Sequence, residues 1–169
     1  MEPEDPRTPT GPARTRDQAR AEAEALLTGD LPDDAALQRV VETLAAGHPS
    51  WGWVGVYLLV GDRLVLGPFV GPPTEHTRIP IGVGVCGTAV ARDTNVVVDD
   101  VRRLDNYLAC SAGTRSEIVV LIRDAGAVVG QFDVDSDDVA AFGPDDEALL
   151  DHLAALAGPR CRRLGAGLA

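Results

Sequence analysis

Apolar residues recur with helical spacing in the first third of the chain. One stripe at positions i, i+3, i+4 and i+7 predicts a helix over residues 33–46 that ends at Gly47; it comprises Leu37, Val40, Val41 and Leu44. The preceding stretch over residues 17–27 (DQARAEAEALL) is rich in strong helix formers, and Thr28 and Gly29 after it favour a helix end. The pattern therefore predicts two helices in this region.

The spacing changes to that of β-strands from Trp51 onward. Residues 51–60 (WGWVGVYLLV) are mostly apolar, β-branched or aromatic, and residues 63–70 (RLVLGPFV) predict the returning strand of a hairpin. A second hairpin is predicted from the strands 117–123 and 127–134. The shorter predicted elements between them are a strand at 78–81, a glycine turn and short helix over 82–93, a strand at 96–98 and an irregular loop over 105–115.

The last predicted element is a helix that begins after Phe142 and Gly143. Pro144 occupies its first turn, next to acidic residues that complement the helix dipole. Gly158 and Pro159 are expected to kink or break this helix near its end. Because strands do not alternate regularly with helices, the order predicts an α+β fold, with an antiparallel sheet of about five or six strands and helices packed on one face.

Length and composition fit one folded domain. The chain has 169 residues, of which 45% are hydrophobic, and about 100–200 residues suffice for a domain. Residues 1–16 hold four of the 12 prolines and are predicted to form a disordered N-terminal tail, which leaves residues 17–165 as the domain. No apolar run is long enough to span a bilayer, and the acidic N-terminus does not resemble a secretory signal. We therefore expect a cytoplasmic protein with no membrane contact.

Charge excludes several classes of function. The formal net charge is −11, whereas a nucleic-acid-binding domain usually carries a basic face, so no nucleic-acid partner is expected. All 15 basic residues are arginines. The absence of lysine excludes Schiff-base chemistry and the phosphate-binding lysine of a P-loop. Sites built on carboxylates or thiols stay open.

The three cysteines, Cys86, Cys110 and Cys161, are candidates for redox chemistry. Their odd number argues against a disulfide scaffold, and neither they nor the scattered histidines have the spacing of zinc ligands, so no metal is expected. Cys86 lies in GVGVCG (82–87), which matches G-x-G-x-x-G. Without a complete βαβ unit this motif favours a glycine turn entering a helix over a dinucleotide site. In the first turn of that helix, the Cys86 thiol is expected to have a lowered pKa.

The other two cysteines differ in their surroundings. Cys110 lies between small residues in the irregular loop. A lone cysteine is often a small residue of the hydrophobic core, but a cysteine in an irregular loop is less often buried there. Cys161 lies between Arg160 and Arg162 and is expected at the surface, where the arginines favour its thiolate and a minor role as a redox partner.

Carboxylates supply the second set of candidates. The strand sequence QFDVD alternates Asp133 and Asp135 with apolar residues, so both aspartates lie on one face of the sheet. Such a face is usually solvated, but no basic residue in this strand balances the two charges, and a cationic ligand would do so. Glu117 opens the neighbouring apolar strand, where burial raises a carboxyl pKa, as suits a proton donor.

Together these motifs resemble a known enzyme family. The segments WVGVYLL, LVLGPF, RIP, GVCGTA, VVVDDV, the LAC loop, SEIVV and DVDS follow one another in the order and spacing of the free methionine-(R)-sulfoxide reductases, which are GAF-domain enzymes. The resemblance runs from about Trp51 to Ser136 and continues into the final helix. It implies a GAF domain over residues 17–165, with a small-molecule pocket on the sheet face opposite the helices.

The resemblance also implies a reaction and its partners. The substrate would be free L-methionine-(R)-sulfoxide, the product methionine, and the electron donor thioredoxin or another thiol, with no cofactor. Reduction would leave a cysteine sulfenic acid that a second thiol converts to an intramolecular disulfide, and thiol exchange would restore the enzyme. A homodimer is implied by analogy with other GAF domains.

Roles for the thiols follow from the same resemblance. Cys110 matches the loop cysteine and is assigned as the nucleophile, and Cys86 matches the GVCG cysteine of the active site. Members with three active-site cysteines carry one ten residues before the GVCG cysteine, where this chain has His76. Cys86 would then resolve Cys110, or the two would exchange roles, or a small-molecule thiol would take over. Milder departures are Leu121 in place of a proline and Ser111 in place of an aspartate.

The remaining roles are assigned in the same way. Glu117 would protonate the sulfoxide oxygen, Asp133 and Asp135 would hold the substrate's ammonium group, and Trp53 with Tyr57 would cover its methyl end. The alternative from another class is a non-catalytic GAF module that senses a small ligand or a redox state through the two thiols. A purely structural dimerisation domain leaves the three carboxylates unexplained. The combination of thiols and carboxylates favours the enzyme.

Overall fold

The structure, a computed structural model, describes residues 13–105, 107 and 112–169. Its elements are α1 (Arg16–Thr28), α2 (Asp33–Gly47), β1 (Trp53–Val60), β2 (Arg63–Val70), β3 (Arg78–Pro80), α3 (Gly84–Arg92), β4 (Val96–Val98), a 3₁₀ turn (Val101–Arg103), β5 (Ser116–Asp124), β6 (Ala127–Ser136) and α4 (Pro144–Leu168). Every predicted helix and strand is present, with bounds shifted by a residue or two. Most of the predicted tail over residues 1–16 lies outside the described residues.

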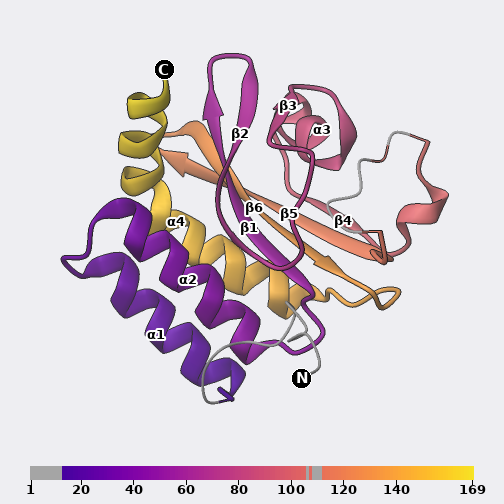
Figure 1. The fold of residues 1–169 in the computed structure, drawn as a ribbon, viewed down its shortest axis with the longest axis horizontal. Helices are drawn as coiled ribbons and strands as arrows, with labels where there is room; N and C mark the ends of the chain where they lie inside the picture. Colours follow the sequence, from indigo (N-terminus) through magenta and orange to yellow (C-terminus); the bar gives the residue numbers. More distant parts are fainter. Residues whose placement is uncertain (1–12, 106, 108–111) are drawn as a thin grey trace, which may run out of the picture.

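The strands form one antiparallel sheet in the order β3-β2-β1-β6-β5-β4. Figure 1 shows α1, α2 and α4 together on one face of this sheet and α3 apart from them, on the other. The predicted α+β fold with an antiparallel sheet is therefore confirmed, and α3 adds a short helix to the second face. None of the helices within the described residues has the length and apolar character needed to cross a membrane.

Alternation along the central strands gives the sheet two different faces. In β1, Val54 and Val56 pack toward α1, α2 and α4, whereas Trp53 and Tyr57 face α3. This is the period of two expected of a strand. Both sides of the sheet bury some polar groups, but on the face toward α3 four polar side chains are buried together: Glu117, Gln131, Asp133 and Asp135. Because buried polar groups cost free energy unless they are partnered, the α3 face is where a functional site is expected.

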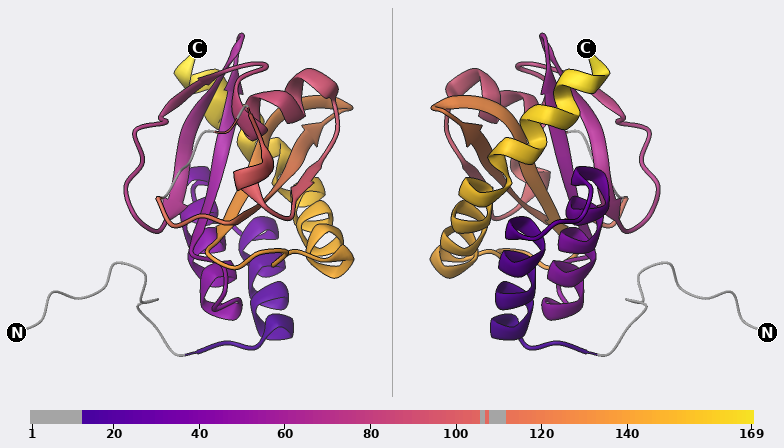
Figure 2. Two further views of the ribbon diagram at one scale, coloured as in Figure 1. Left: turned by 90° about the vertical axis from the view of Figure 1, so that its right-hand side faces the viewer. Right: turned by 90° about the vertical axis from the view of Figure 1, so that its left-hand side faces the viewer.

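The last helix passes over β5 without a break. Of the two alternatives predicted at Gly158 and Pro159, a kink or a break, the break is absent, since α4 continues to Leu168. Figure 2 shows its C-terminal part turned away from the axis of its first part, as the alternative prediction of a kink requires. A Cβ on Gly158 would lie 2.2 Å from the carbonyl oxygen of Arg123. Glycine at this position therefore permits the close contact between α4 and the backbone of β5.

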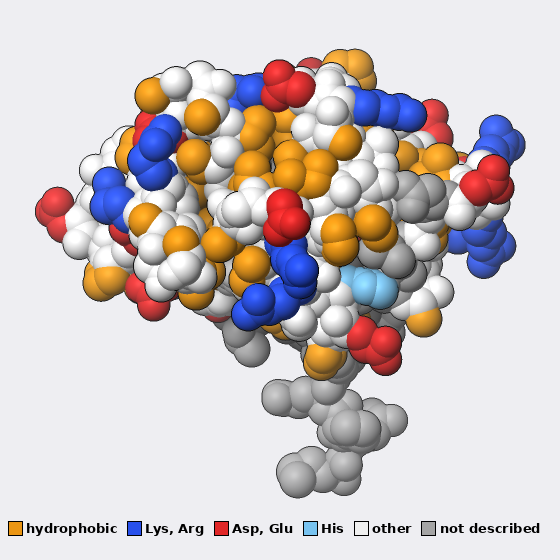
Figure 3. Space-filling model, turned by 90° about the horizontal axis from the view of Figure 1, so that it is seen from above, with side chains coloured by type: hydrophobic (Ala, Val, Ile, Leu, Met, Phe, Trp, Pro, Cys, Tyr) orange, Lys and Arg blue, Asp and Glu red, His pale blue; other side chains and the backbone are white. Residues whose placement is uncertain are grey.

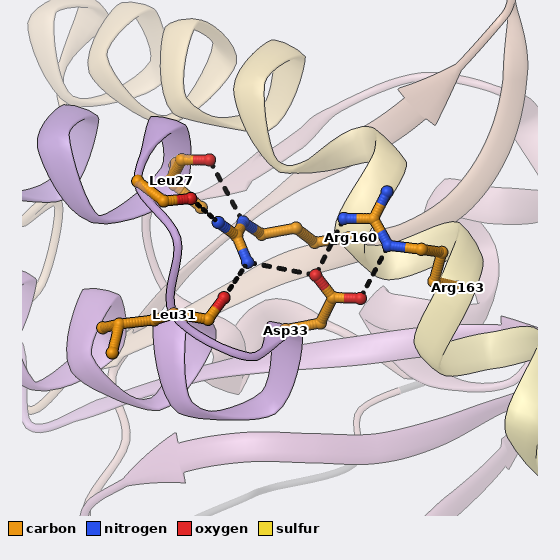
Figure 4. Close-up of polar contacts among 6 residues, drawn as sticks. Leu27, Leu31, Asp33, Arg160 and Arg163 are labelled. Atoms are coloured by element: carbon orange, nitrogen blue, oxygen red, sulfur yellow. Dashed lines mark hydrogen bonds and ion pairs between the residues drawn. The ribbon is translucent and has the colours of Figure 1, made fainter.

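One buried arginine joins α4 to the segment between α1 and α2 (Figure 4). Arg160 is 6% exposed, and its guanidinium donates hydrogen bonds to the carbonyl oxygens of Leu27 at 3.1 Å, Leu31 at 2.7 Å and Gly29 at 2.6 Å. It also pairs with Asp33 at 3.0 Å, which Arg163 contacts at 2.7 Å. We call this the Arg160 cluster. A cation is favoured there because helix C-terminal carbonyls carry partial negative charge.

The end of the molecule that carries the β1–β2 hairpin, α3 and the C-terminus is shown in Figure 3. Hydrophobic side chains gather near the middle of this face, and acidic and basic side chains lie around them. At the junction of β3 and α3, Ile81 and Val83 are 39% and 37% exposed. Exposed apolar residues of this kind are common on soluble proteins, so this face alone indicates no function.

Candidate active site

Three neighbouring strands bring the predicted acidic residues to the α3 side of the sheet. Trp53 and Gly55 of β1 lie opposite Asp135 and Asp133 of β6. On its other side, Asp135 lies opposite Glu117 of β5. The prediction that the two aspartates share one face is confirmed, and that face is buried instead of solvated.

Cys86 reaches the same place from α3. Its helix begins at Gly84, so the prediction that Cys86 lies in the first turn is confirmed. A Cβ on Gly87 would lie 2.5 Å from the carbonyl oxygen of Pro80, so glycine lets α3 pack closely against the end of β3. The Cys86 Sγ lies 3.8 Å from Glu117 Oε1. Potential ligand atoms of Cys86, Glu117 and Asp133 all lie within 4.8 Å of one another.

Burial dominates the electrostatics of the carboxylates. Glu117 and Asp135 are each 2% exposed and Asp133 is fully buried. Burial raises the pKa of Glu117 well above its ordinary value, the charges of Asp133 and Asp135 raise it further, and the contact with Cys86 opposes the rise. Burial and Asp133 also raise the pKa of Asp135, against the effect of the Thr114 hydroxyl. The direction for Glu117 is the one that the sequence predicts, and it keeps a proton available for donation.

An indole ring forms a wall beside Asp135. Trp53 lies over Gly55, where a Cβ would come within 2.4 Å of the ring carbon Cη2. The indole stacks on Phe69 with ring centroids 5.4 Å apart, and its Nε1–H donates to the carbonyl oxygen of Pro72 at 3.1 Å. Packing and hydrogen bonding therefore fix the orientation of the ring.

Tyr57 extends this aromatic wall. Its ring centroid lies 6.3 Å from that of Trp53, and its hydroxyl donates to the backbone carbonyl of His76 at 2.8 Å. This hydrogen bond ties the β2–β3 loop at His76 to the aromatic wall.

A cavity of about 150 Å³ opens beside these residues and is lined by Gly52, Trp53, Pro72, Gly113, Thr114, Asp135 and Asp137. An apolar cavity of roughly this volume holds a molecule the size of benzene, so the space suits a small ligand and not a folded partner. The thiol of Cys86 is not among its lining groups. The cavity thus reaches Asp135, and the cluster of Cys86, Glu117 and Asp133 lies farther along the same face.

The cysteines have three different outcomes. Cys86 lies in the site, whereas Cys110 lies outside the described residues. The prediction that Cys161 is a surface residue is wrong, because it is fully buried in the core between α4 and the sheet. Burial raises the pKa of its thiol to about 12. Helical position, not the flanking arginines, decides its environment, and its thiolate is not available for redox exchange.

Two polar side chains of this face were missed from the sequence. Gln131 is fully buried, and neither atom of its amide has a hydrogen-bond partner among the described residues. It precedes Asp133 by two positions, so the period that predicts the aspartates would also have identified it. Thr114 is 6% exposed, and its hydroxyl lies near the Asp135 carboxyl, whose pKa it lowers. It lies in the irregular loop, where no pattern marks a buried residue.

Chemically, the site combines a thiol, a carboxyl that retains its proton, and further carboxylates at a small cavity. A protonated carboxyl beside a sulfur can donate a proton to a leaving oxygen. Unbalanced buried carboxylates attract a cationic group of a ligand. The rigid aromatic wall offers an apolar surface to the rest of such a molecule.

Known proteins share this arrangement of sequence and fold. Residues 34–160 match the family model described as GAF domain. The free methionine-R-sulfoxide reductase of Escherichia coli (strain K12) is 40% identical over 131 residues, which span 78% of this chain and 79% of that protein.

Two solved structures are also similar. One is a free methionine-R-sulfoxide reductase from Neisseria meningitidis in complex with its substrate, with 34% identity and a TM-score of 0.81 over 94% of this chain and 98% of that chain. The other is a type II free methionine-R-sulfoxide reductase from Thermoplasma acidophilum, with 39% identity and a TM-score of 0.76 over 78% of this chain and 93% of that chain.

Proposed function

The chain belongs to the free methionine-(R)-sulfoxide reductases, a GAF-domain family of oxidoreductases, and we propose that it reduces free L-methionine-(R)-sulfoxide to L-methionine by thiol chemistry. The observation that carries this proposal is the buried contact between the Cys86 thiol and the Glu117 carboxyl, 3.8 Å from Sγ to Oε1. A sulfur and a proton donor are the two groups that reduction of a sulfoxide requires.

The substrate's ammonium group binds to Asp133 and Asp135, and its methyl end packs against Trp53 and Tyr57. Supporting this orientation, both aspartates are buried on one face of β6, and the indole of Trp53 is held beside Asp135 by its hydrogen bond to Pro72. A cation beside carboxylates removed from water gains more than the same pair does in solvent. The small volume of the cavity favours a free amino acid over a methionine residue within a folded protein.

Reduction begins with attack of the Cys110 thiolate on the sulfoxide sulfur. Glu117 donates its proton to the sulfoxide oxygen, the sulfur–oxygen bond breaks, methionine leaves, and the oxygen passes to the cysteine as a sulfenic acid. The Cys86 thiol then attacks the sulfenic sulfur, a disulfide forms, and water leaves. Two electrons from two thiols thus reduce one sulfoxide. The exchange of roles between the two cysteines is the alternative order.

A thioredoxin or a small thiol reduces the disulfide and completes the cycle. No cofactor takes part in this scheme. Thioredoxin as the reductant, the homodimer and a cytoplasmic location stay predictions. With His76 at the position of the third family cysteine, resolution falls to Cys86 or to an external thiol.

An epimer-resolved turnover assay tests the proposal. Purified protein with dithiothreitol should convert free methionine-(R)-sulfoxide to methionine and leave the (S) epimer unchanged. Cys110→Ser should abolish turnover, whereas Cys161→Ala, which removes the buried thiol outside the site, should retain it. No turnover with dithiothreitol or thioredoxin, together with binding of a small ligand, would contradict the enzyme and favour the sensing module.

A further inference from the structure

The cluster of Cys86, Glu117 and Asp133 has the donor set of a metal site. One thiol sulfur and two carboxylate oxygens lie within 4.8 Å of one another, and all three residues are buried. Cys86 and Glu117 are 31 positions apart in sequence. No short sequence motif therefore identifies these residues as a possible metal site. Thiolate and carboxylate ligands together suit a borderline ion such as Zn²⁺ better than a hard ion such as Mg²⁺ or Ca²⁺.

The distances also suit zinc. With a Zn–S bond of about 2.3 Å and Zn–O bonds of about 2.0–2.2 Å, tetrahedral geometry separates a sulfur and an oxygen ligand by roughly 3.5 Å. The Cys86 Sγ and Glu117 Oε1 are 3.8 Å apart. The observed separation of these two atoms is therefore close to the one that a shared tetrahedral ion requires.

Charge balance provides a second, independent observation. Glu117 Oε2 is buried and has no hydrogen-bond partner among the described residues, and Asp135 is buried with the Thr114 hydroxyl as its polar neighbour. Within the described ranges, no ion pair joins either residue to a basic side chain. A divalent cation beside Glu117 would compensate carboxylates that otherwise must stay protonated or repel one another.

We propose that Cys86, Glu117 and Asp133 bind one Zn²⁺-type divalent cation with a fourth position open, and that the bound ion inhibits the reductase. Binding displaces the thiol proton and any carboxyl protons to solvent. The ion ties up a thiol and the proton donor and places positive charge where the substrate's ammonium group binds. The inhibition rests on the proposed function, whereas the binding does not.

Direct metal binding tests the site without reference to activity. Reduced full-length protein, freed of metal and of added thiol, should bind one equivalent of Zn²⁺ in competition with a chromophoric chelator. Co²⁺ in its place should show a thiolate-to-metal charge-transfer band. Cys86→Ser should remove that band, and Glu117→Gln and Asp133→Asn should each weaken Zn²⁺ affinity by more than about tenfold, since even loss of an outer-shell partner costs 10–100-fold.

Two variants serve as matched controls. Asp137→Asn makes the same chemical change as Asp133→Asn at an exposed cavity residue outside the three-ligand group, and Cys161→Ala removes a thiol elsewhere. Both should bind Zn²⁺ as the unaltered protein does. Absence of stoichiometric binding, or binding that is unchanged in both Glu117→Gln and Asp133→Asn, would overturn the metal site.

Single turnover tests the inhibition. Prereduced protein without added thiol should lose methionine formation over the same Zn²⁺ range as the binding titration and regain it with a chelator. If the protein binds Zn²⁺ but forms no methionine even when Zn²⁺ is absent, the proposed function and the inhibition are both contradicted. The metal site is still supported in that case. Methionine formation that Zn²⁺ does not affect would overturn the inhibition alone.

Discussion

Two buried charged clusters lie on opposite sides of the sheet, and they differ in how their charges are balanced. In the Arg160 cluster, the guanidinium donates to three backbone carbonyls and to Asp33, so each of its nitrogens has a partner. In the carboxylate cluster of Glu117, Asp133 and Asp135, Glu117 Oε2 has no hydrogen-bond partner among the described residues, and no described basic side chain forms an ion pair with Glu117 or Asp135. One cluster is balanced within the chain, and the other has buried negative charge that the proposed ligands would balance.

This difference indicates that the Arg160 cluster stabilises the fold, whereas the carboxylate cluster serves binding and chemistry. A fully hydrogen-bonded buried ion holds elements together, and removal of one partner leaves the others uncompensated. A buried carboxyl without partners lowers the stability of the fold. Proteins retain such groups mainly at functional sites, where the carboxyl takes part in binding or catalysis. Variants in the two clusters should therefore separate stability from activity.

The largest expected effect is on catalysis at Glu117. Glu117→Gln keeps the shape of the side chain but removes the proton donor, so kcat/KM should fall by about 10²–10⁴-fold. Unfolding in urea should occur at the same or a higher denaturant concentration, because a buried ionisable group becomes neutral. Glu42→Gln, the same change at an exposed position of α2, should alter neither quantity. A large loss of stability in Glu117→Gln would show that the carboxylate cluster stabilises the fold, which contradicts the difference between the two clusters.

The next effect is on stability at Arg160. Arg160→Met leaves three carbonyls without their donor and should lower the free energy of unfolding by about 3–5 kcal/mol. Arg163→Met removes an arginine whose side chain is 59% exposed and which also contacts Asp33, so it should cost only about 0–1 kcal/mol. Urea unfolding followed by circular dichroism measures both. Equal losses in the two variants would contradict a structural role that depends on burial.

A smaller effect concerns the pH dependence of stability. Because the folded-state pKa of Glu117 is raised above its ordinary value near 4.5, the folded state binds the proton more tightly than the unfolded chain does. The resulting stabilisation is full below pH 4.5 and is lost as pH rises toward the folded-state pKa. Glu117→Gln lacks this loss, so its stability relative to the unaltered protein should increase with pH above 4.5. A difference that does not change between pH 4 and 8 would contradict the raised pKa.

The smallest expected effect is at Cys161. Its thiol is buried and its pKa is about 12, so a thiol reagent at pH 8 should label it only after unfolding in urea. Cys161→Ala should leave kcat/KM unchanged. Mass spectrometry of the labelled native protein distinguishes this cysteine from the other two, and rapid native labelling would show that the core around α4 opens.

Local sequence patterns were enough to predict the elements and the faces of the strands. The stripe that includes Leu37 and Leu44 forms the buried side of α2, and the alternation around Asp133 gives the buried acidic face of β6. Backbone geometry imposes these periods on any helix or strand, so neighbours in sequence carry the information. The motif resemblance then identified the family. Position within a long helix was harder to interpret: the expectation at Pro159 left a kink and a break open, of which only the kink is present, and the prediction of a surface Cys161 was wrong.

Only the tertiary structure decided which groups meet and which of them are buried. A turn of helix and two strands, distant in sequence, bring the Cys86 thiol to the carboxyls of Glu117 and Asp133. The same packing removes Glu117 and Asp135 from water and thereby raises their pKa values. Desolvation and coulombic repulsion depend on distances across the fold and on excluded solvent, which no local period encodes. The chain by itself therefore determined the parts of this site, and three-dimensional packing determined their chemistry.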